Sequence, residues 1–382
     1  MKNIFYWSPC LSNIGTINST LNSAIGLKKY FKEDYKVVII NVCGEWDKYR
    51  VYLKKNNIEI KDLGFNYFKF LPKEGYIFSR ISYLIIFILS FLPLKRLLLK
   101  NKPDHLILHL ITSLPLFIML TNKVDTNFIL RISGFPKLNF IRKLFWKKIS
   151  NKIKYITFPS YGSLEDMKLH KIFDEKKMIF LQDPFINVSK FNEIFKNKEK
   201  VENNFFIDKK YFIAVGRLTK QKNFKYLIKE FSKFCKFNNN YALLIFGEGE
   251  EKNLLNQFII KNKLQNYIYL MGYQKNVMNY MKKAEAFILS SLWEDPGSVL
   301  IESAYSNLYI ISSDCKNGPK EFLSNGNAGL LFKSNRENKL YESLNLFLNK
   351  ENLFKQKVLA KKNSKTYTMF QHSIKLNKIL IN

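Results

Sequence analysis

The sequence predicts an α/β protein of two domains, each built on a doubly wound parallel sheet. Its 382 residues are enough for two domains of roughly 100 to 200 residues. Short apolar runs rich in β-branched and aromatic residues alternate with segments of helical period along both halves of the chain. We place the first domain at residues 1–186, an Asn-rich and Lys-rich linker at 187–207, the second domain at 208–366 and a final helix at 367–382.

The composition limits the class of protein but leaves its partner open. Four cysteines and four histidines are scattered without a C-x-x-C pair, so neither a disulfide framework nor a zinc site is indicated. The formal charge of +31 and the pI of about 9.7 favour a polyanionic neighbour, such as nucleic acid, anionic lipid or a phosphorylated substrate. A general bias toward Lys and Asn explains the same excess, and the sign of the charge does not choose between them.

The first domain carries its earliest candidate residues after its first strand. Gly15 and Thr16 lie where that strand hands over to a helix, at the carboxyl edge where open α/β sheets bind ligands. A simple βα turn is the alternative. Strands of this domain are expected at 3–8, 36–42, 105–110, 127–132, 155–160 and 178–181.

Two segments of the first domain are candidates for contact with a membrane. Residues 76–100 hold more Phe, Ile and Leu than one helix face needs, and residues 137–154 interleave seven basic residues with apolar ones. The longest apolar run, 83–93, has 11 residues, against roughly 20 for a membrane span. We therefore expect no transmembrane helix and no signal peptide, but a helix lying on an anionic bilayer. A solvated helix packed on its own domain is the alternative for 137–154.

The second domain opens with a strand at 211–215, followed by Gly216, Arg217 and, at the start of the next helix, Lys222. A guanidinium fork and a compact ammonium are both suited to binding phosphate oxygens. A surface charge couple is the structural alternative for this pair.

Two further turns of the second domain hold candidate residues. Gly247 follows a strand at 242–246, although a Gly-x-Gly turn is a weak signal by itself. Tyr273 follows a strand at 267–271, and we favour a core position for its ring over contact with a ligand.

The strongest motif begins after the strand at 286–291. Asp295 is a natural N-cap and Pro296 fits the first helical position, so the amides of Gly297, Ser298 and Val299 are expected to lack intrahelical acceptors. Such amides form an anion cradle.

Two carboxylates flank that cradle. Glu294 comes just before the expected cap, and Glu302 lies about two turns along the helix, roughly 10 Å further on. A nucleotide-sugar has the same layout, with a hydroxyl-rich sugar, a diphosphate and a ribose diol in a row.

The residues around these carboxylates resemble the donor site of a known family. The pattern Ser-Ser-x-x-Glu-x-Pro-Gly-x-Val-Leu-Ile-Glu-x-Ala, followed by a strand and Ser-x-Asp-x-x-x-Gly-Pro-x-Glu, is similar to that of the retaining glycosyltransferases of family 4. The Gly-Arg and Lys-Asn pairs before the helix at 224–237 agree with the same family. The resemblance covers most of the second domain, and the first domain only in outline.

This resemblance implies a fold and a chemistry. The fold is GT-B, with two Rossmann-like domains facing a cleft and the last helix crossing back to the first domain. Glu294 is then expected to bind donor-sugar hydroxyls and Glu302 the ribose diol. Arg217, Lys222 and the helix amides would stabilise the leaving diphosphate, while the loops of Gly247 and Tyr273 border the donor.

The resemblance also implies that the anomeric configuration is retained and that no metal is required. The chain contains no Asp-x-Asp ligand pair, which agrees with metal independence and with the absence of any cofactor.

The first domain departs from the family at one position. Family members often carry a histidine next to glycine after a strand of this domain, whereas this chain has Ser133 there. Serine does not carry a proton at neutral pH as histidine can. The orienting role near the acceptor therefore falls to Arg131, Ser133 or His109, or to no side chain at all.

These observations predict a glycosyltransferase that moves a sugar from a nucleoside-diphosphate sugar, with UDP as the default, to a lipid-linked or glycan acceptor. The pathway expected from the family is capsule, lipopolysaccharide or related surface-glycan synthesis, at the cytoplasmic face of the inner membrane. The rivals are a basic nucleic-acid-binding protein, an inactive scaffold and a sugar-phosphate synthase of the same fold. Nucleic acid is not expected as a partner, because the clearest basic cluster is one amphipathic helix.

Overall fold

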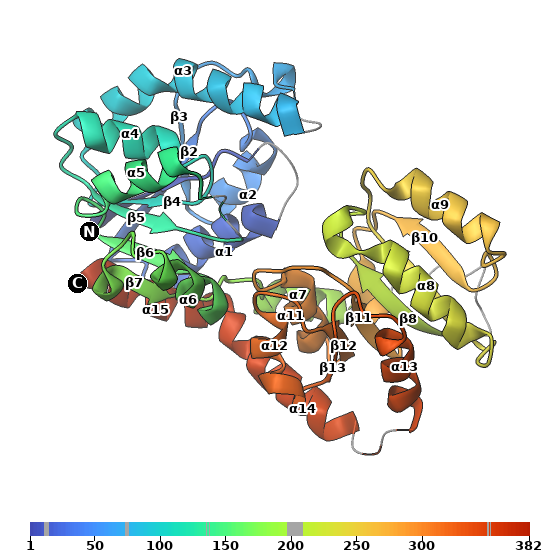
Figure 1. Cartoon of the computed structure of the whole chain (residues 1–382). Helices are drawn as coiled ribbons and strands as arrows, with labels where there is room; N and C mark the ends of the chain where they lie inside the picture. The colour runs from blue at the N-terminus through green and yellow to red at the C-terminus, as the bar shows by residue number, and fades with distance from the viewer. Residues whose placement is uncertain are drawn as a thin grey trace. The chain divides into compact units, whose positions relative to one another are not determined.

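The computed structural model describes residues 1–10, 15–72, 76–134, 136, 138–196, 209–349, 351 and 353–382. The chain forms two compact units: unit 1 holds Met1–Pro159, Ser163–Phe185 and Met369–Asn382, and unit 2 holds Ser160–Gly162 and Ile186–Thr368. Each unit contains one parallel sheet with helices packed on it (Figure 1). The prediction of two doubly wound α/β sheets is thereby confirmed.

The sheet of unit 1 has seven strands in the order β3-β2-β1-β4-β5-β6-β7, and every pair is parallel. The strand order reverses between β1 and β4, so the loops after these two strands flank the switch point. The strands are β1 (Lys2–Trp7), β2 (Tyr35–Asn41), β3 (Glu59–Asp62), β4 (His105–Leu108), β5 (Asn127–Arg131), β6 (Tyr155–Phe158) and β7 (Met178–Phe180).

Both faces of this sheet are buried, as the near-continuous apolar strands require. Alternate residues of β1 belong to different cores: Phe5 and Trp7 lie in one cluster, Ile4 and Tyr6 in the other. The helices that cover the two faces are α1 (Gly15–Tyr30), α2 (Arg50–Lys55), α3 (Tyr76–Asn101), α4 (Ser113–Thr121), α5 (Phe140–Ile149), α6 (Tyr161–Leu169) and α15 (Met369–Ile381).

The C-terminal helix α15 packs against α1 within unit 1. The Lys2 ammonium donates to the Leu380 carbonyl at 2.8 Å, and the His372 ring lies between Ser23 and the Gln182 carbonyl. The expected linker 187–207 begins with helix α7 (Val188–Lys196), which belongs to unit 2, and its residues 197–207 lie outside the described residues.

Helix α3 is longer than the apolar run 83–93 suggested, because its ends carry polar and basic residues that break the run but suit a helix. By length and composition Phe78–Asn101 could cross a membrane, and 33% of its most apolar window is buried inside the protein. Core helices of many proteins meet the same test. The basic helix expected over 137–154 is confined to Phe140–Ile149, and Lys137 lies outside the described residues.

The sheet of unit 2 has six parallel strands in the order β10-β9-β8-β11-β12-β13. Its order reverses between β8 and β11, so the loops after these strands meet at the second switch point. The strands are β8 (Lys210–Val215), β9 (Tyr241–Phe246), β10 (Ile268–Gly272), β11 (Ala286–Leu289), β12 (Tyr309–Ser313) and β13 (Leu330–Phe332).

Aromatic residues fill one core of unit 2, where Phe212 of β8 contacts the rings of Phe231, Phe234 and Phe347. Amphipathic helices bring these rings to the sheet. The helices of unit 2 are α7, α8 (Phe224–Cys235), α9 (Lys252–Lys261), α10 (Val277–Met281), α11 (Ser298–Tyr305), α12 (Pro319–Phe322), α13 (Lys339–Asn349) and α14 (Leu353–Ser364).

Candidate donor site of unit 2

Two loops at the switch point of unit 2 are joined side by side. The loop after β8 contains Gln221 and Lys222, and the loop after β11 runs from Ser290 to Gly297. The Leu292 amide donates to the Gln221 carbonyl at 2.8 Å, and the Gln221 side chain donates to the Trp293 carbonyl at 2.9 Å. The Ser290 hydroxyl donates to the Lys222 carbonyl at 2.7 Å. These contacts make the two loops one structural element.

The charged centre of this element is an ion pair between Lys222 and Glu294. The Lys222 Nζ lies 2.5 Å from Oε1 of Glu294, and the two side chains are only 15% and 6% exposed. The Ser291 hydroxyl donates to the same oxygen at 2.6 Å. A Cβ at Gly216 would lie 3.0 Å from Cε of Lys222, so this glycine lets the lysine stem lie close to the backbone. The sequence placed Lys222 and Glu294 in one site, and they are in direct contact.

A third loop fixes the backbone of Glu294. The Glu294 amide donates to the Lys316 carbonyl at 2.6 Å, and the Asn317 amide donates to the Glu294 carbonyl at 2.7 Å. Gly318 packs so closely that a Cβ there would lie 2.5 Å from Cα of Pro296. The Gly-Pro pair of the sequence motif therefore serves this contact between loops. Both sides of the Glu294 peptide are held.

The expected start of helix α11 is wrong. The helix begins at Ser298, and Gly297 is the N-cap residue, with φ 101° and no side-chain capping bond. Because Gly297 still has a left-handed conformation, neither Asp295 caps the helix nor Pro296 occupies its first turn. The amides without intrahelical acceptors are then those of Ser298, Val299 and Leu300, one residue later than predicted. Free amides are therefore present at the start of α11, as an anion cradle would require.

The second carboxylate, Glu302, lies in α11 little more than one turn from its start, about 6 Å along the axis. Burial raises the pKa of Glu302 to about 7, and the positive charge of Lys190 opposes this shift. Among the described residues the Glu302 carboxyl has no hydrogen-bond or ion-pair partner. Since desolvation penalises the charged form, this group gains most from a ligand that donates hydrogen bonds to it.

The remaining predicted residues of unit 2 lie in three different environments. Arg217 is exposed, and its guanidinium contacts no acid in the described part of the chain. Gly247 has φ 139°, and a Cβ on it would lie 1.9 Å from the Gly216 carbonyl oxygen, so its role is close packing of two loops. Tyr273 is 76% exposed, and the favoured core position is wrong because the residue follows the tight turn at Gly272.

The unit 1 candidates near the first switch point form a buried polar chain. His109 follows β4, and its Nδ1 lies 3.2 Å from the Thr20 hydroxyl, which donates to the Thr16 carbonyl. Burial first, then the charges of Arg131 and His372, lower the pKa of His109 well below its ordinary value. The imidazole is therefore neutral at pH 7. Gly15 is exposed at the first position of α1.

Arg131 and Ser133 are paired with each other and with an acid. Nε of Arg131 donates to Oδ1 of Asp183 at 2.8 Å, a second guanidinium nitrogen contacts Oδ2, and NH1 donates to the Ser133 hydroxyl at 2.8 Å. Arg131 is 8% exposed. This is the geometry of a structural ion pair, and it occupies two of the three residues proposed to replace the family's histidine.

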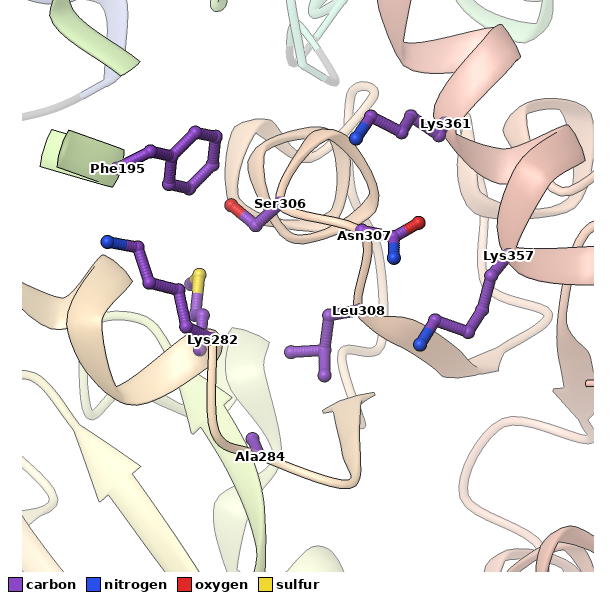
Figure 2. Close-up of a pocket in the computed structure, with 9 residues that line it drawn as sticks. Phe195, Lys282, Ala284, Ser306, Asn307, Leu308, Lys357 and Lys361 are labelled. Carbon is purple, nitrogen blue, oxygen red and sulfur yellow. The ribbon is translucent and has the colours of Figure 1, made fainter. Parts of the chain in front are cut away.

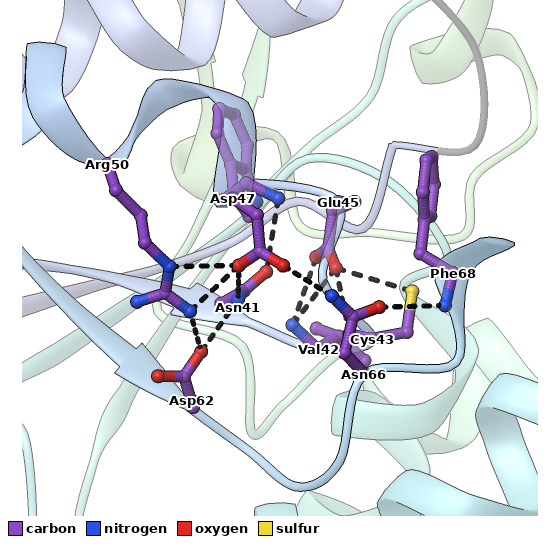
Figure 3. Close-up of polar contacts among 10 residues, drawn as sticks. Asn41, Val42, Cys43, Glu45, Asp47, Arg50, Asp62, Asn66 and Phe68 are labelled. Atoms are coloured by element: carbon purple, nitrogen blue, oxygen red, sulfur yellow. Dashed lines mark hydrogen bonds and ion pairs between the residues drawn. The ribbon is translucent and has the colours of Figure 1, made fainter.

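A second polar cluster of unit 1 follows β2 and β3 (Figure 3). Arg50 bridges Asp47 and Asp62, and the buried Glu45 carboxylate accepts the amides of Val42 and Cys43. These groups satisfy one another and tie the loop after β2. Across the described ranges, no three His, Cys, Asp or Glu side chains gather as they would around a metal ion.

Unit 2 also has a cavity of about 400 Å³ at the opposite edge of its sheet, beside the residues that precede β11 and β12 (Figure 2). Lys357 and Lys361 of α14 lie on one side and Lys282 on the other. The Lys282 ammonium donates to the Ile194 carbonyl at 2.8 Å. No predicted site residue lines this cavity, because all of them follow the carboxyl ends of strands.

The sequence interpretation missed several residues that build the site. Ser290, Ser291 and Gln221 hold the charged residues, and Asn317 holds the Glu294 backbone. The Ser-Ser pair at the end of β11 was a visible signal, since small hydroxyl residues at a strand end commonly bond neighbouring backbone. The contacts of Gln221 and Asn317 depend on the approach of distant loops.

Part of the chain is similar to known glycosyltransferases. Residues 195–366, which make up most of unit 2, match the family model Glycosyl transferases group 1. The chain is 34% identical over 245 residues to an uncharacterized glycosyltransferase, MJ1059, of Methanocaldococcus jannaschii, covering 58% of each chain. It is 29% identical over 196 residues, or 51% of each chain, to N-acetylgalactosamine-N,N'-diacetylbacillosaminyl-diphospho-undecaprenol 4-alpha-N-acetylgalactosaminyltransferase of Campylobacter jejuni. The matches thus span about half the length of these relatives.

Solved structures show the same fold over the whole chain. A glycosyltransferase of Rickettsia africae superposes with a TM-score of 0.76 at 17% identity, covering 99% of this chain and 97% of that one. HepE of Anabaena, solved with UDP and glucose, superposes with a TM-score of 0.72 at 11% identity over 100% of both chains. The fold is GT-B, and the match to the group 1 glycosyltransferase family model is confined to residues 195–366.

Replacement of Gly247 by Ala tests the loop packing beneath the site. The new Cβ would clash with the Gly216 carbonyl, and the residue would keep a φ that side chains disfavour, so we expect a loss of about 1–3 kcal/mol in unfolding free energy. Urea denaturation measures it. Gly64→Ala is the control, since a Cβ at Gly64 meets nothing within 4 Å. Equal stabilities of the two variants would contradict the packing role.

Proposed function

We propose that the protein is a metal-independent retaining glycosyltransferase that uses a nucleoside-diphosphate sugar as donor. The observation that carries the proposal is the meeting of Lys222, Glu294 and the first turn of α11 at the carboxyl edge of the unit 2 sheet. Open α/β sheets bind nucleotides at this edge and at the switch point. The group 1 match and the relatives named as glycosyltransferases support the reaction class.

Each residue of the site has a role in this proposal. The amides of Ser298 to Leu300 and the exposed Arg217 bind the diphosphate, and Lys222 adds a compact charge beside them. Glu294 binds hydroxyls of the donor sugar, and Glu302 accepts from the ribose diol. As the bond to the anomeric carbon breaks, negative charge grows on the leaving diphosphate, and these fixed donors stabilise it.

The acceptor hydroxyl attacks from the face of the leaving group, and its proton passes to the departing phosphate oxygen. This route gives retention and does not use a protein base. Burial lowers the pKa of His109, which makes its imidazole a poor proton acceptor, in agreement with this route. One bond forms and one breaks at the anomeric carbon: the acceptor oxygen bonds to it, while its bond to the phosphate oxygen is cleaved.

UDP is the proposed nucleotide, and a lipid-linked or glycan acceptor of a surface-glycan pathway is the proposed partner. The fold neighbour HepE was solved with UDP, and the Campylobacter relative is named for a diphospho-undecaprenol acceptor. A soluble phosphosugar acceptor would instead indicate a sugar-phosphate synthase.

A thermal-shift panel of UDP, GDP, ADP, CMP and their sugar conjugates, each with and without EDTA, tests the donor. Ligand at about 100 times its dissociation constant should add about 2.7 kcal/mol to the unfolding free energy. We expect a base-selective shift that survives EDTA and is lost in Arg217→Ala and Glu302→Ala. Glu285 precedes β11 at the opposite edge of the sheet, so the control variant Glu285→Ala should keep the nucleotide-induced shift. Absence of a shift with every nucleotide would refute the proposal.

The raised pKa of Glu302 predicts pH-dependent donor binding. The ribose diol donates to the ionised carboxylate, so affinity should rise as pH increases through about 7, by about tenfold from pH 6 to pH 8. Because the pKa of Glu302 is higher in the folded than in the unfolded protein, its carboxyl ionises less readily in the folded state. The unligated protein should therefore lose stability as the pH rises from about 4.5 to about 7. Calorimetry with a nucleotide-sugar, whose diphosphate diester does not titrate in this range, measures the affinity. Glu302→Gln should abolish the dependence, and an unchanged slope in that variant would contradict the assignment.

We further propose that unit 1 lies on the cytoplasmic surface of an anionic inner membrane. Helix α4 packs against both α3 and α5 (Figure 1). Along α3, exposed apolar side chains recur at helical spacing and so form one stripe, and α5 adds three more. This apolar face consists of Phe78, Ile81, Leu84, Ile88, Leu92, Phe140, Ile141 and Leu144.

The charges beside the apolar face select an anionic bilayer. Lys143, Lys147 and Lys148 of α5 are exposed, and Arg142 lies close enough to Arg80 for the two charges to interact. Each basic residue near an anionic leaflet contributes about 1 kcal/mol. Apolar side chains flanked by lysines and arginines are the pattern of a helix that lies in the interface.

Vesicle sedimentation tests this surface. The wild type should bind vesicles of phosphatidylglycerol and phosphatidylethanolamine, and bind phosphatidylcholine at least tenfold more weakly. The variant Leu84→Glu/Ile88→Glu should lose binding, because both residues are about 60% exposed on the stripe. Phe237→Glu, at an 80% exposed apolar residue of unit 2, should not. Equal binding by all three proteins, or binding of single-stranded RNA in place of vesicles, would refute the membrane assignment.

A further inference from the structure

The hydrogen bond from Ser291 divides the two oxygens of Glu294 between different tasks. We propose that Ser291 is a positioning residue that, together with Lys222, holds Oε1 of Glu294 and leaves Oε2 to accept a hydroxyl of the donor sugar. This inference rests on the proposed donor site. It assigns a role to a residue that touches neither nucleotide nor sugar itself.

Both donors to the Glu294 carboxylate reach the same oxygen. The Ser291 hydroxyl lies 2.6 Å and the Lys222 ammonium 2.5 Å from Oε1. In the part of the chain that the structure describes, no donor reaches Oε2. A carboxylate oxygen accepts about two hydrogen bonds, so Oε1 is saturated while Oε2 keeps its full capacity. The two oxygens are chemically equal, and only their surroundings distinguish them.

Ser291 is itself firmly held, which a positioning role requires. It is fully buried, and its carbonyl accepts the hydroxyls of Ser313 at 2.7 Å and Ser334 at 3.3 Å. The preceding Ser290 bonds the Lys222 carbonyl. The two adjacent serines that follow β11 thus hold one charged residue each.

The environment of Oε2 indicates where its ligand lies. A Cβ at Gly297 would lie 3.5 Å from Oε2, so this oxygen lies next to the start of α11. The first turn of this helix carries the free amides proposed to bind the diphosphate. A sugar linked to that diphosphate therefore comes within reach of Oε2. We infer that the hydroxyl that donates a hydrogen bond to Oε2 lies near the anomeric end of the sugar.

The ratio of two dissociation constants tests this inference. Binding of UDP, GDP or ADP, whichever the wild type binds, is compared with binding of its glucose, galactose and N-acetylglucosamine conjugates by calorimetry. In Ser291→Ala only Lys222 still holds Oε1 of Glu294, so the carboxylate is less firmly oriented and we expect affinity for the best conjugate to fall about tenfold. Affinity for the nucleoside diphosphate should change by less than about twofold. Ser291→Thr, which keeps the hydroxyl, should restore the ratio to within about threefold.

Ser312→Ala is the matched control, because Ser312 is equally buried at the end of β12 but bonds only a backbone carbonyl. If Ser291 acts through Glu294, the ratio in Ser291→Ala/Glu294→Gln should equal that in Glu294→Gln alone. If Ser291→Ala does not fold, Ser291→Cys, a weak donor of similar size, takes its place. An unchanged ratio, or equal losses for conjugate and nucleoside diphosphate, would overturn the positioning role alone. A wild type that binds none of the three nucleotides would overturn the donor site as well.

Discussion

The buried ion pair between Lys222 and Glu294 is the interaction on which the ligand edge of unit 2 depends. Its two residues come from loops that follow different strands, and both are largely removed from water. Removing one partner of such a pair typically costs about 3–5 kcal/mol, because the other charge stays buried and unpaired. The pair is therefore stable only while the two loops stay together. The hydrogen bonds of the Gln221 and Ser290 side chains hold the loops in this position. Gly216 and Gly247 lie so close together that a side chain at Gly247 would collide with the Gly216 carbonyl, so glycine is what lets the loops that contain these two residues approach.

Two carboxylates of the same site differ because their partners differ. Glu294 has a cation and a hydroxyl at one oxygen, whereas Glu302 lies in a desolvated position with only the distant charge of Lys190 to oppose the rise of its pKa. Such contrasts between neighbouring titratable groups mark functional sites more often than structural ones. A ligand that carries both hydroxyls and negative charge suits the pair. In the proposed function, the hydroxyls of this ligand would bond to the carboxylates and its phosphates to Arg217 and the helix amides. No acid in the described part of the chain contacts Arg217 or these amides.

Much of the fold followed from local pattern, and the errors came from contacts between distant segments. The strands of unit 2 could be predicted because buried parallel strands are short apolar runs, and the motifs predicted that Lys222 and Glu294 belong to one site. The start of α11 was predicted two residues too early. Asp295 and Pro296 have strong local preferences for a helix start, but the loop packing at Gly318 determines the path of the backbone there. Tyr273 was misjudged because an aromatic residue after a strand is usually buried, and only the tight turn at Gly272 exposes it.

The polar candidate residues of unit 1 are engaged in contacts within that unit and offer no free charged group to the proposed chemistry. Its three polar candidates are all occupied: His109 is neutral and bonded to Thr20, and Arg131 is bonded both to Ser133 and to Asp183. An arginine that forms a two-point contact with a buried aspartate is not available to a substrate without losing that contact. Among the candidate residues that the structure describes, Arg217 and the free amides at the start of α11, all in unit 2, are the donors without such a partner. A serine at the position of the family's histidine agrees with this division, because the route in which the leaving phosphate takes the acceptor proton requires no ionisable side chain from unit 1.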